Sequence, residues 1–161
     1  PDARVQVDNA RFFSQGNRMT YDESVEVATV AKHLADQSHQ FTQYSGVRPN
    51  GVALIIAGVD QKGESIYVTD PSGTYVQYAA IAIGAGSDEV NAFLEKHYNS
   101  NMSLSDAASL AIASINLKAE QKEGLNHIKM AKVTSDKKIF EKVSESDLQN
   151  YSKNASKFTT S

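Results

Sequence analysis

The chain has 161 residues, of which 40% are hydrophobic and 22% charged, with a net charge of -3 and no cysteine. These values are typical of one globular domain with a sizeable core, and they argue against a basic surface for nucleic acid or anionic lipid. The absence of cysteine excludes disulfides, thiolate metal ligands and a thiol nucleophile, and it fits a cytoplasmic protein. The longest apolar run is far short of the roughly 20 residues that a membrane span needs.

Two helices are predicted before the first strand. The first begins at Pro1-Asp2 and ends at Gly16, a residue type that commonly stops helices. Its apolar residues lie on two sides, Ala3, Val7 and Ala10 on one and Val5, Phe12 and Phe13 on the other. We therefore expect other elements to cover this helix from two directions. The second helix is predicted from about Ser24 to Tyr44, with a single apolar stripe at helical spacing.

The run from Val52 to Val59 is the longest uninterrupted apolar stretch, and we predict that it is the central strand. Pro49 holds the residue before it in extended or turn geometry, and the turn-rich tetrad 60–63 ends the run. An apolar run of this length, rich in Val and Ile, is typical of a strand covered on both faces. Gly51 and Gly58 near its two ends argue against a helix.

Turn residues and periodicity predict the remaining elements. Residues 65–69 and 74–78 form a hairpin around the turn 70–73, and a further strand covers 80–83. Helices capped by Ser87 and Ser103 follow, then a strand pair near 128–134 and 139–143. A last helix starts near Ser144 and frays into a polar tail over residues 156–161. We predict a single domain over residues 1–155 of the α+β class, with a largely antiparallel sheet under helices.

The chemistry-bearing residues indicate no catalytic, cofactor or metal site. His33 and His39 are six residues apart, about 240° around a helix, so they cannot share a metal as an i, i+4 pair could. The sequence contains no Gly-x-Ser-x-Gly elbow, no Ser-x-x-Lys and no His-Glu-x-x-His. The carboxylates are scattered along predicted solvent-facing positions.

Residues 81–89 (IAIGAGSDE) have the order strand, Gly-x-Gly, helix, with which a dinucleotide fingerprint begins. Glu89 stands where the third glycine belongs, however, and Asp88 and Glu89 place negative charge where a pyrophosphate would lie. A second helix follows instead of the parallel strand of a Rossmann unit. We interpret the segment as a tight strand-to-helix turn, with a small nucleotide-binding domain as the distant alternative.

Three further motifs occur together: residues 47–60 (VRPNGVALIIAGVD), 70–75 (DPSGTY) and 82–86 (AIGAG). In sequence and spacing they resemble proteasome α subunits of the archaeal type, and the resemblance runs from Asp2 to about Tyr151. Asn50 departs from it, because the family usually carries an aromatic residue there. The family signature positions, which the resemblance implies are structural, are Arg48, Pro49, Gly51, Gly58, Asp70, Pro71, Gly73, Gly84 and Gly86.

The resemblance implies a four-layer αββα sandwich of the N-terminal-nucleophile hydrolase type, here without its N-terminal strands. It implies a non-catalytic α-ring subunit of the 20S proteasome core particle, with a structural and gating role in ATP-dependent or ubiquitin-like-dependent protein degradation. The expected partners are other α subunits, β subunits and, for a full-length protein, a proteasome activator or regulatory ATPase. No cofactor is implied.

The alternative is a truncated catalytic relative, either a β-type threonine peptidase or another hydrolase of the same fold. In such enzymes the amine of an N-terminal threonine acts as the base for its own hydroxyl. This chain opens with Pro1-Asp2, and Arg48-Pro49 and residues 70–73 resemble α-type features. Without the opening strands, apolar faces would stay uncovered, so we expect the fragment to self-associate.

Overall fold

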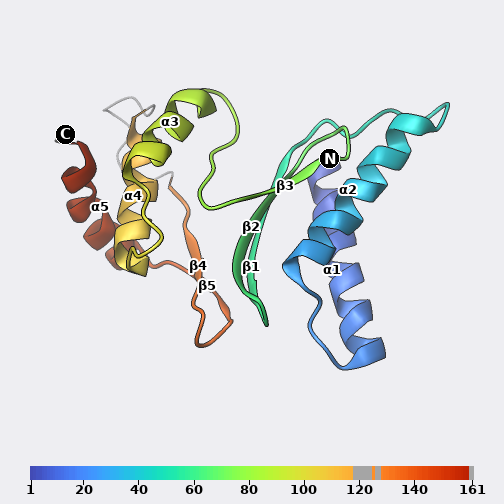
Figure 1. Cartoon of the computed structure of the whole chain (residues 1–161), viewed down its shortest axis with the longest axis horizontal. Helices are drawn as coiled ribbons and strands as arrows, with labels where there is room; N and C mark the ends of the chain where they lie inside the picture. The colour runs from blue at the N-terminus through green and yellow to red at the C-terminus, as the bar shows by residue number, and fades with distance from the viewer. Residues whose placement is uncertain (118–124, 126–127, 160–161) are drawn as a thin grey trace. The chain divides into compact units, whose positions relative to one another are not determined.

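The computed structural model describes residues 1–117, 125 and 128–159 (Figure 1). The helices are α1 (Asp2–Tyr21), α2 (Val27–Gln43), α3 (Ser87–His97), α4 (Leu104–Asn116) and α5 (Glu145–Thr159). The strands are β1 (Leu54–Asp60), β2 (Gly63–Thr69), β3 (Tyr75–Tyr78), β4 (Ala131–Val133) and β5 (Phe140–Lys142). The predicted mixture of helices and antiparallel strands is confirmed.

The chain divides into two compact units, Pro1–Ala79 with Thr134–Lys138, and Ala80–Val133 with Ile139–Ser161. Beside this division, the single domain expected over residues 1–155 stays a prediction. Helix α5 continues to Thr159 and so includes residues 156–159 of the expected polar tail, which itself stays a prediction. Residues 160 and 161 lie outside the described part of the chain.

The sheet of the first unit has the order β1-β2-β3, with both pairs antiparallel. Leu54 pairs with Thr69 and Asp60 with Gly63, so the two longer strands align over their full length. The hairpin predicted around residues 70–73 is confirmed, since Thr69 pairs with Tyr75 across that turn.

The two faces of β1 have different surroundings. A Cβ on Gly58 would lie 2.8 Å from Cγ2 of Val27, so this side of the strand faces α2. Ile55 and Ala57 point to the opposite side, where Ile55 is 44% exposed. Within the first unit α2 covers one face of the sheet, and cover on the other face stays a prediction. Ile55 pairs with Val68, and cross-strand partners share a face, so this second face carries apolar residues from both strands.

Helix α1 does not stop at Gly16, as predicted, but runs on to Tyr21. A glycine in a helix interior costs about 1 kcal/mol, which weakens the helix without ending it. The left-handed residue that ends α1 is Asp22, with φ 54°. The expected cover from two directions is also not found, because α2 packs along one side while Val5 and Phe12 are 57% and 69% exposed.

The single apolar stripe predicted for the second helix is confirmed. The buried residues of α2 recur at helical spacing and are Val27, Ala31, Leu34, Ala35 and Ser38. They form the core of the first unit between α2 and the sheet, which Figure 1 shows beside each other.

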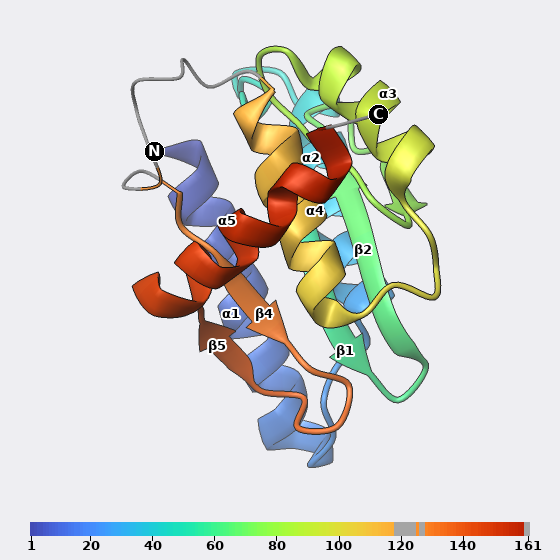
Figure 2. The same ribbon diagram turned by 90° about the vertical axis from the view of Figure 1, so that its left-hand side faces the viewer.

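The second unit is built from α3, α4, α5 and the β4–β5 hairpin. Figure 2 shows α5 against α4, and one cluster between them contains Ile112, Ala113, Leu148 and Ala155. A second cluster joins Val90 and Leu94 of α3 to Leu110 of α4. The predicted cap on α4 is confirmed, because the Ser103 hydroxyl accepts a hydrogen bond from the backbone N–H of Asp106.

Two predictions for the second unit are wrong. Residues 81–83 form no strand; instead the Asn91 side chain binds the backbone of Ala82 through its amide oxygen at 2.7 Å and its nitrogen at 3.1 Å. A side-chain amide thus takes the place of a neighbouring strand. Ser87 is the first residue of α3 and not its cap, since Gly86 occupies the N-cap position with φ 77°.

Candidate functional site

The first group of signature residues fastens the turn before β1 to the start of α1. Arg48 donates from Nη1 and Nη2 to the two carboxylate oxygens of Asp2, each at 2.7 Å. The backbone N–H of Gly51 donates to the same carboxylate at 2.9 Å. The hydrogen bonds from Arg48 and then Gly51 hold the pKa of Asp2 well below its usual range. Such a bidentate pair fixes the orientation of both groups, and so it positions the turn.

Asn50, which departs from the family pattern, takes part in a polar network behind this turn. Its Nδ2 donates to Oγ of Ser38 at 3.2 Å, and Nε2 of Gln6 donates to the same oxygen at 3.3 Å. Gln6 and Ser38 are buried. The network therefore joins α1, α2 and the turn before β1.

Asp60, at the end of β1, caps helix α2 from a distance. The backbone N–H of Val27 donates to Oδ2 at 2.9 Å and that of Lys62 to Oδ1 at 2.7 Å. These bonds, the one from Val27 foremost, lower the pKa of Asp60. Glu26, the residue at the N-cap position, makes no side-chain cap bond. The sequence had indicated only a turn at Asp60, because its partner is 33 residues away.

The second group of signature residues builds the β2–β3 turn. Oδ1 of Asp70 accepts from the backbone N–H of Ser72 at 2.8 Å and of Thr74 at 3.2 Å, and also from the Ser72 hydroxyl. The Ser72 hydroxyl and then the backbone donors lower the pKa of Asp70. Gly73 has φ 91°, and a Cβ there would lie 2.5 Å from Cβ of His39. The turn therefore presses directly on α2.

Seven signature residues lie in the first unit, where Gly58 and Gly73 approach α2, whereas Gly84 and Gly86 belong to the second unit. Both of these glycines have positive φ, 107° and 77°. The N–H of Ser87 donates to the carbonyl of Gly84 at 3.2 Å, which closes a tight turn before α3. Positive φ favours glycine, so the backbone alone accounts for both residues.

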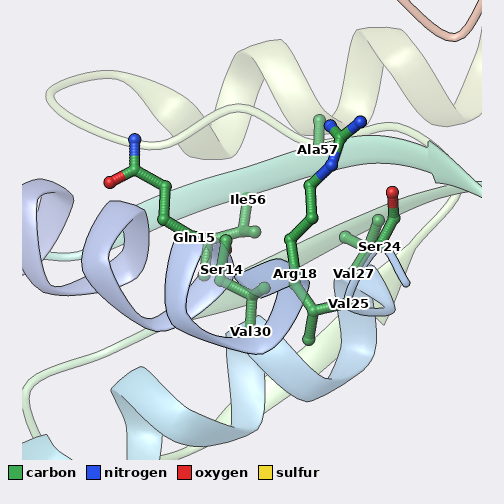
Figure 3. A pocket seen from close by; sticks show the side chains of 9 residues that line it. All are labelled: Ser14, Gln15, Arg18, Ser24, Val25, Val27, Val30, Ile56 and Ala57. Atoms are coloured by element: carbon green, nitrogen blue, oxygen red, sulfur yellow. The ribbon is translucent and has the colours of Figure 1, made fainter. Parts of the chain in front are cut away.

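A pocket of about 410 Å³ lies along α1, α2 and β1 (Figure 3). Its lining residues are Ser14, Gln15, Arg18, Ser24, Val25, Val27, Val30, Ile56 and Ala57. Figure 3 shows the Arg18 side chain extending from α1 beside Ala57, while Gln15 points the other way. Ile56 and Ala57 point to opposite faces of the sheet, so the pocket reaches β1 at its edge. Arg18 is the ionisable member of this lining, which therefore offers no acid–base pair.

His33 and His97 pack against aromatic rings. The ring of His33 stacks on Phe13 at 4.0 Å between centroids, and His97 lies against Phe93 and Phe158. Among residues 1–117, 125 and 128–159, no group of three or more His, Cys, Asp or Glu is arranged to hold a metal ion. No helix in the same ranges is long and apolar enough to cross a membrane.

The first unit thus combines an antiparallel sheet with paired helices, and the carboxylates of Asp60 and Asp70 fix its turns. Residues 1–133 match the family described as proteasome subunit. The chain is 43% identical over 150 residues to proteasome subunit alpha of Archaeoglobus fulgidus. The matched stretch covers 93% of this chain and 61% of that protein. It is 41% identical to proteasome subunit alpha of Pyrococcus horikoshii, in a match that covers 93% of this chain and 57% of that protein. It is 39% identical to proteasome subunit alpha of Pyrobaculum aerophilum, in a match that covers 91% of this chain and 60% of that protein.

The chain therefore belongs to the proteasome subunit family, and the predicted resemblance to α subunits is confirmed. Family membership implies the N-terminal-nucleophile hydrolase fold. The chain spans about 60% of the length of the curated relatives that it matches.

Proposed function

We propose that this chain is part of a non-catalytic α-ring subunit of a 20S proteasome core particle. Its role would be structural and gating, in ATP-dependent or ubiquitin-like-dependent protein degradation. The observation that carries the proposal is the 43% identity to a proteasome subunit alpha over 93% of this chain. The catalytic alternative, a β-type threonine peptidase, has less support because the similar proteins named above are all α subunits.

The signature residues have a structural role in this proposal. Arg48, Pro49 and Gly51 shape the turn that leads into β1, and Gly58 allows β1 to approach Val27 of α2. The motif Asp70, Pro71 and Gly73 seats the next turn against the same helix, and Gly84 and Gly86 shape the turn before α3. Together these residues fix strand ends and turns, which is what a ring subunit needs for a constant shape.

We extend the proposal to the four-layer αββα sandwich for the full-length protein, with further strands before the present chain. The support is the apolar side of the first sheet that points away from α2. Ile55 and Ala57 pair with Val68 and Ile66, so apolar residues from two strands share this face, and Ile55 is 44% exposed. The pocket beside Ile56 and Ala57 adjoins the edge of β1 that faces away from β2. A preceding strand paired with that edge would close the pocket, and a second sheet packed on the apolar face would cover it.

The proposed partners are other α subunits, β subunits and, at the ring's outer surface, an activator or regulatory ATPase. We place the particle in the cytoplasm. The net charge of -3 gives no support to a nucleic-acid or membrane-surface role, and we include neither as a partner.

The test is to produce the full-length protein with and without the β-type subunit of the same source. Native mass spectrometry and negative-stain microscopy should show seven-membered end rings on a particle that cleaves fluorogenic peptides. The particle should lose activity when the N-terminal threonine of the β subunit is replaced by alanine. The α-type protein alone should cleave neither fluorogenic peptides nor unfolded casein. Turnover by that protein alone that survives repurification would contradict the proposal.

A further inference from the structure

The turn before β1 contains a chemically labile link. Asn50 is followed by Gly51, the one Asn-Gly pair in the sequence. Asparagine is a thermolabile residue type, and a glycine after it leaves the next backbone nitrogen unhindered, because glycine has no Cβ. Gly51 is exposed, so water reaches the link. The link would therefore react as it does in an unfolded chain unless other contacts restrain it.

The reaction at such a link is deamidation. The backbone nitrogen of Gly51 loses its proton to water and attacks Cγ of Asn50, which forms a new C–N bond and a cyclic imide. The bond from Cγ to Nδ2 breaks, and Nδ2 leaves as ammonia after it takes up a proton from water. Water then opens the imide at either of its carbonyl groups and leaves aspartate or isoaspartate at position 50. No electron is transferred, and water is the co-reactant.

Hydrogen bonds hold both reacting groups in the folded chain. The N–H of Gly51 donates to Oδ2 of Asp2 at 2.9 Å, and this bond favours the protonated nitrogen, which cannot attack. Asp2 is a poor base for that proton, because the hydrogen bonds from Arg48 and then Gly51 hold its pKa well below its usual range. Nδ2 of Asn50 donates to Oγ of Ser38 at 3.2 Å, and Ser38 is 2% exposed, so this amide is tied to α2. The attacking nitrogen and the amide that it would attack are thus bound to different helices.

We propose that Asn50–Gly51 is a deamidation site, which the clamp formed by Asp2, Arg48 and the N–H of Gly51 holds unreactive while the start of α1 is in place. Local opening at the start of α1 frees the nitrogen of Gly51, and the rate of deamidation follows the population of this open form. The inference goes beyond the proposed function, because the chemistry needs neither a ring nor a partner.

The modification works in one direction. A carboxylate at position 50 has no N–H to donate to Ser38, which also accepts from Gln6. Gln6 and Ser38 are buried, and a charge placed beside them without a new partner carries a desolvation cost. Isoaspartate also adds a carbon atom to the backbone of the turn that leads into β1. Both products therefore oppose closure of the clamp.

Deamidation rates measured by peptide mass spectrometry test the proposal. The full-length protein is incubated at mildly alkaline pH, either folded or in concentrated guanidinium chloride, and is then digested with trypsin. Trypsin does not cleave between Arg48 and Pro49, so Asn50 is the one asparagine of the peptide 33–62. We expect Asn50 to react at least tenfold more slowly in the folded protein than in guanidinium chloride.

Gly51→Ala tests the chemistry of the link. A Cβ at this position would lie 3.6 Å from Oδ2 of Asp2, an ordinary contact, so the variant keeps the fold and the N–H. In guanidinium chloride its Asn50 should react at least tenfold more slowly than that of the parent, because the added methyl group hinders the attack. An unchanged rate, or no deamidation of Asn50 in the denatured parent, would exclude the site.

Two variants release the clamp. Asp2→Ala removes its carboxylate, and Arg48→Gln removes an exposed guanidinium group and leaves the core intact. In the folded protein Asn50 should react at least fivefold faster in Asp2→Ala and at least threefold faster in Arg48→Gln than in the parent. All rates should agree in guanidinium chloride. Circular dichroism checks that the variants are folded, and Arg48→Gln decides alone if Asp2→Ala is not.

Two further variants serve as matched controls. Asp8→Ala removes a carboxylate of the same helix that pairs with Arg4 and Arg11. Asp60→Ala removes the cap of α2 and so controls for a general loss of stability. Both should leave the rate at Asn50 within twofold of the folded parent.

Three results would overturn the role of the clamp. Equal rates in the folded and the denatured parent would show that the structure does not restrain the link. The parent's rate in the folded clamp variants would show that other contacts restrain it. Equal acceleration in Asp60→Ala and in the clamp variants would show that the reaction needs global unfolding. The proposed function is decided separately by the assembly experiment, so either can fail without the other.

Discussion

Replacing Gly73 with alanine tests whether the β2–β3 turn is locked against α2. The substitution adds one methyl group at a residue with φ 91°. That methyl would lie 2.5 Å from Cβ of His39 and 2.8 Å from the carbonyl oxygen of Ala35. Neither atom belongs to the flexible end of a side chain, so the helix or the turn has to move.

The expected cost has two parts. An alanine in the left-handed region costs about 1–2 kcal/mol, and overpacking a closed site typically costs about 1–3 kcal/mol more. Gly46→Ala provides the matched control, because the φ of Gly46 is 87° and no atom lies within 4 Å of the position that the added methyl group would take. The backbone cost is common to both variants, as is the loss of unfolded-chain entropy. Gly73→Ala should therefore lower the free energy of unfolding by about 1–3 kcal/mol more than Gly46→Ala.

Urea unfolding followed by circular dichroism measures this difference. The variants are compared at equal protein concentration, because association changes apparent stability. With a slope of about 1.5 kcal/mol per molar urea, the midpoint of Gly73→Ala should lie roughly 1 M below that of Gly46→Ala. Equal midpoints would refute the close approach of the turn to α2.

Four further predictions follow from the same structure and sequence. Gly16→Ala should stabilise the protein by about 0.5–1 kcal/mol, since Gly16 lies inside α1 with nothing within 4 Å, and a lower melting temperature would contradict this. Asp60→Ala should cost about 1 kcal/mol at neutral pH. Because the folded pKa of Asp60 is lowered from 3.8, this contribution is present above the unfolded pKa and is lost as the pH falls through the folded pKa, so the urea midpoints of variant and parent should converge only at pH values below 3.8, and a constant gap would exclude it. Calorimetric titration with NAD, FAD and ATP should show no binding below millimolar concentrations, because the negative charges of Asp88 and Glu89 follow the Gly84–Gly86 turn where a phosphate would lie. A saturable, phosphate-dependent heat would restore the dinucleotide hypothesis. The 161-residue chain alone should self-associate through its open sheet face, and light scattering that finds a monodisperse monomer without dye binding would show that the chain closes by itself.

Local chemistry was predictable from the sequence, and distant pairing was not. The turn around Asp70 and the cap at Ser103 involve partners within four residues, so the residue types were enough. The pair of Arg48 with Asp2 spans 46 positions, and nothing in one sequence marks it. Residues 80–83 have strand composition, but a strand also needs a neighbour, and the Asn91 side chain binds the backbone instead.

The two expectations of apolar cover have a common physical basis. Periodicity tells which residues avoid water, but it carries no information on which chain covers them. The Val52–Val59 run and the two-sided first helix both predicted more cover than the first unit itself supplies, and Ile55 and Phe12 are exposed. Large exposed apolar patches usually mark surfaces that another part of the protein or a partner covers. An apolar face without a neighbour in its own unit therefore indicates that something outside that unit covers it.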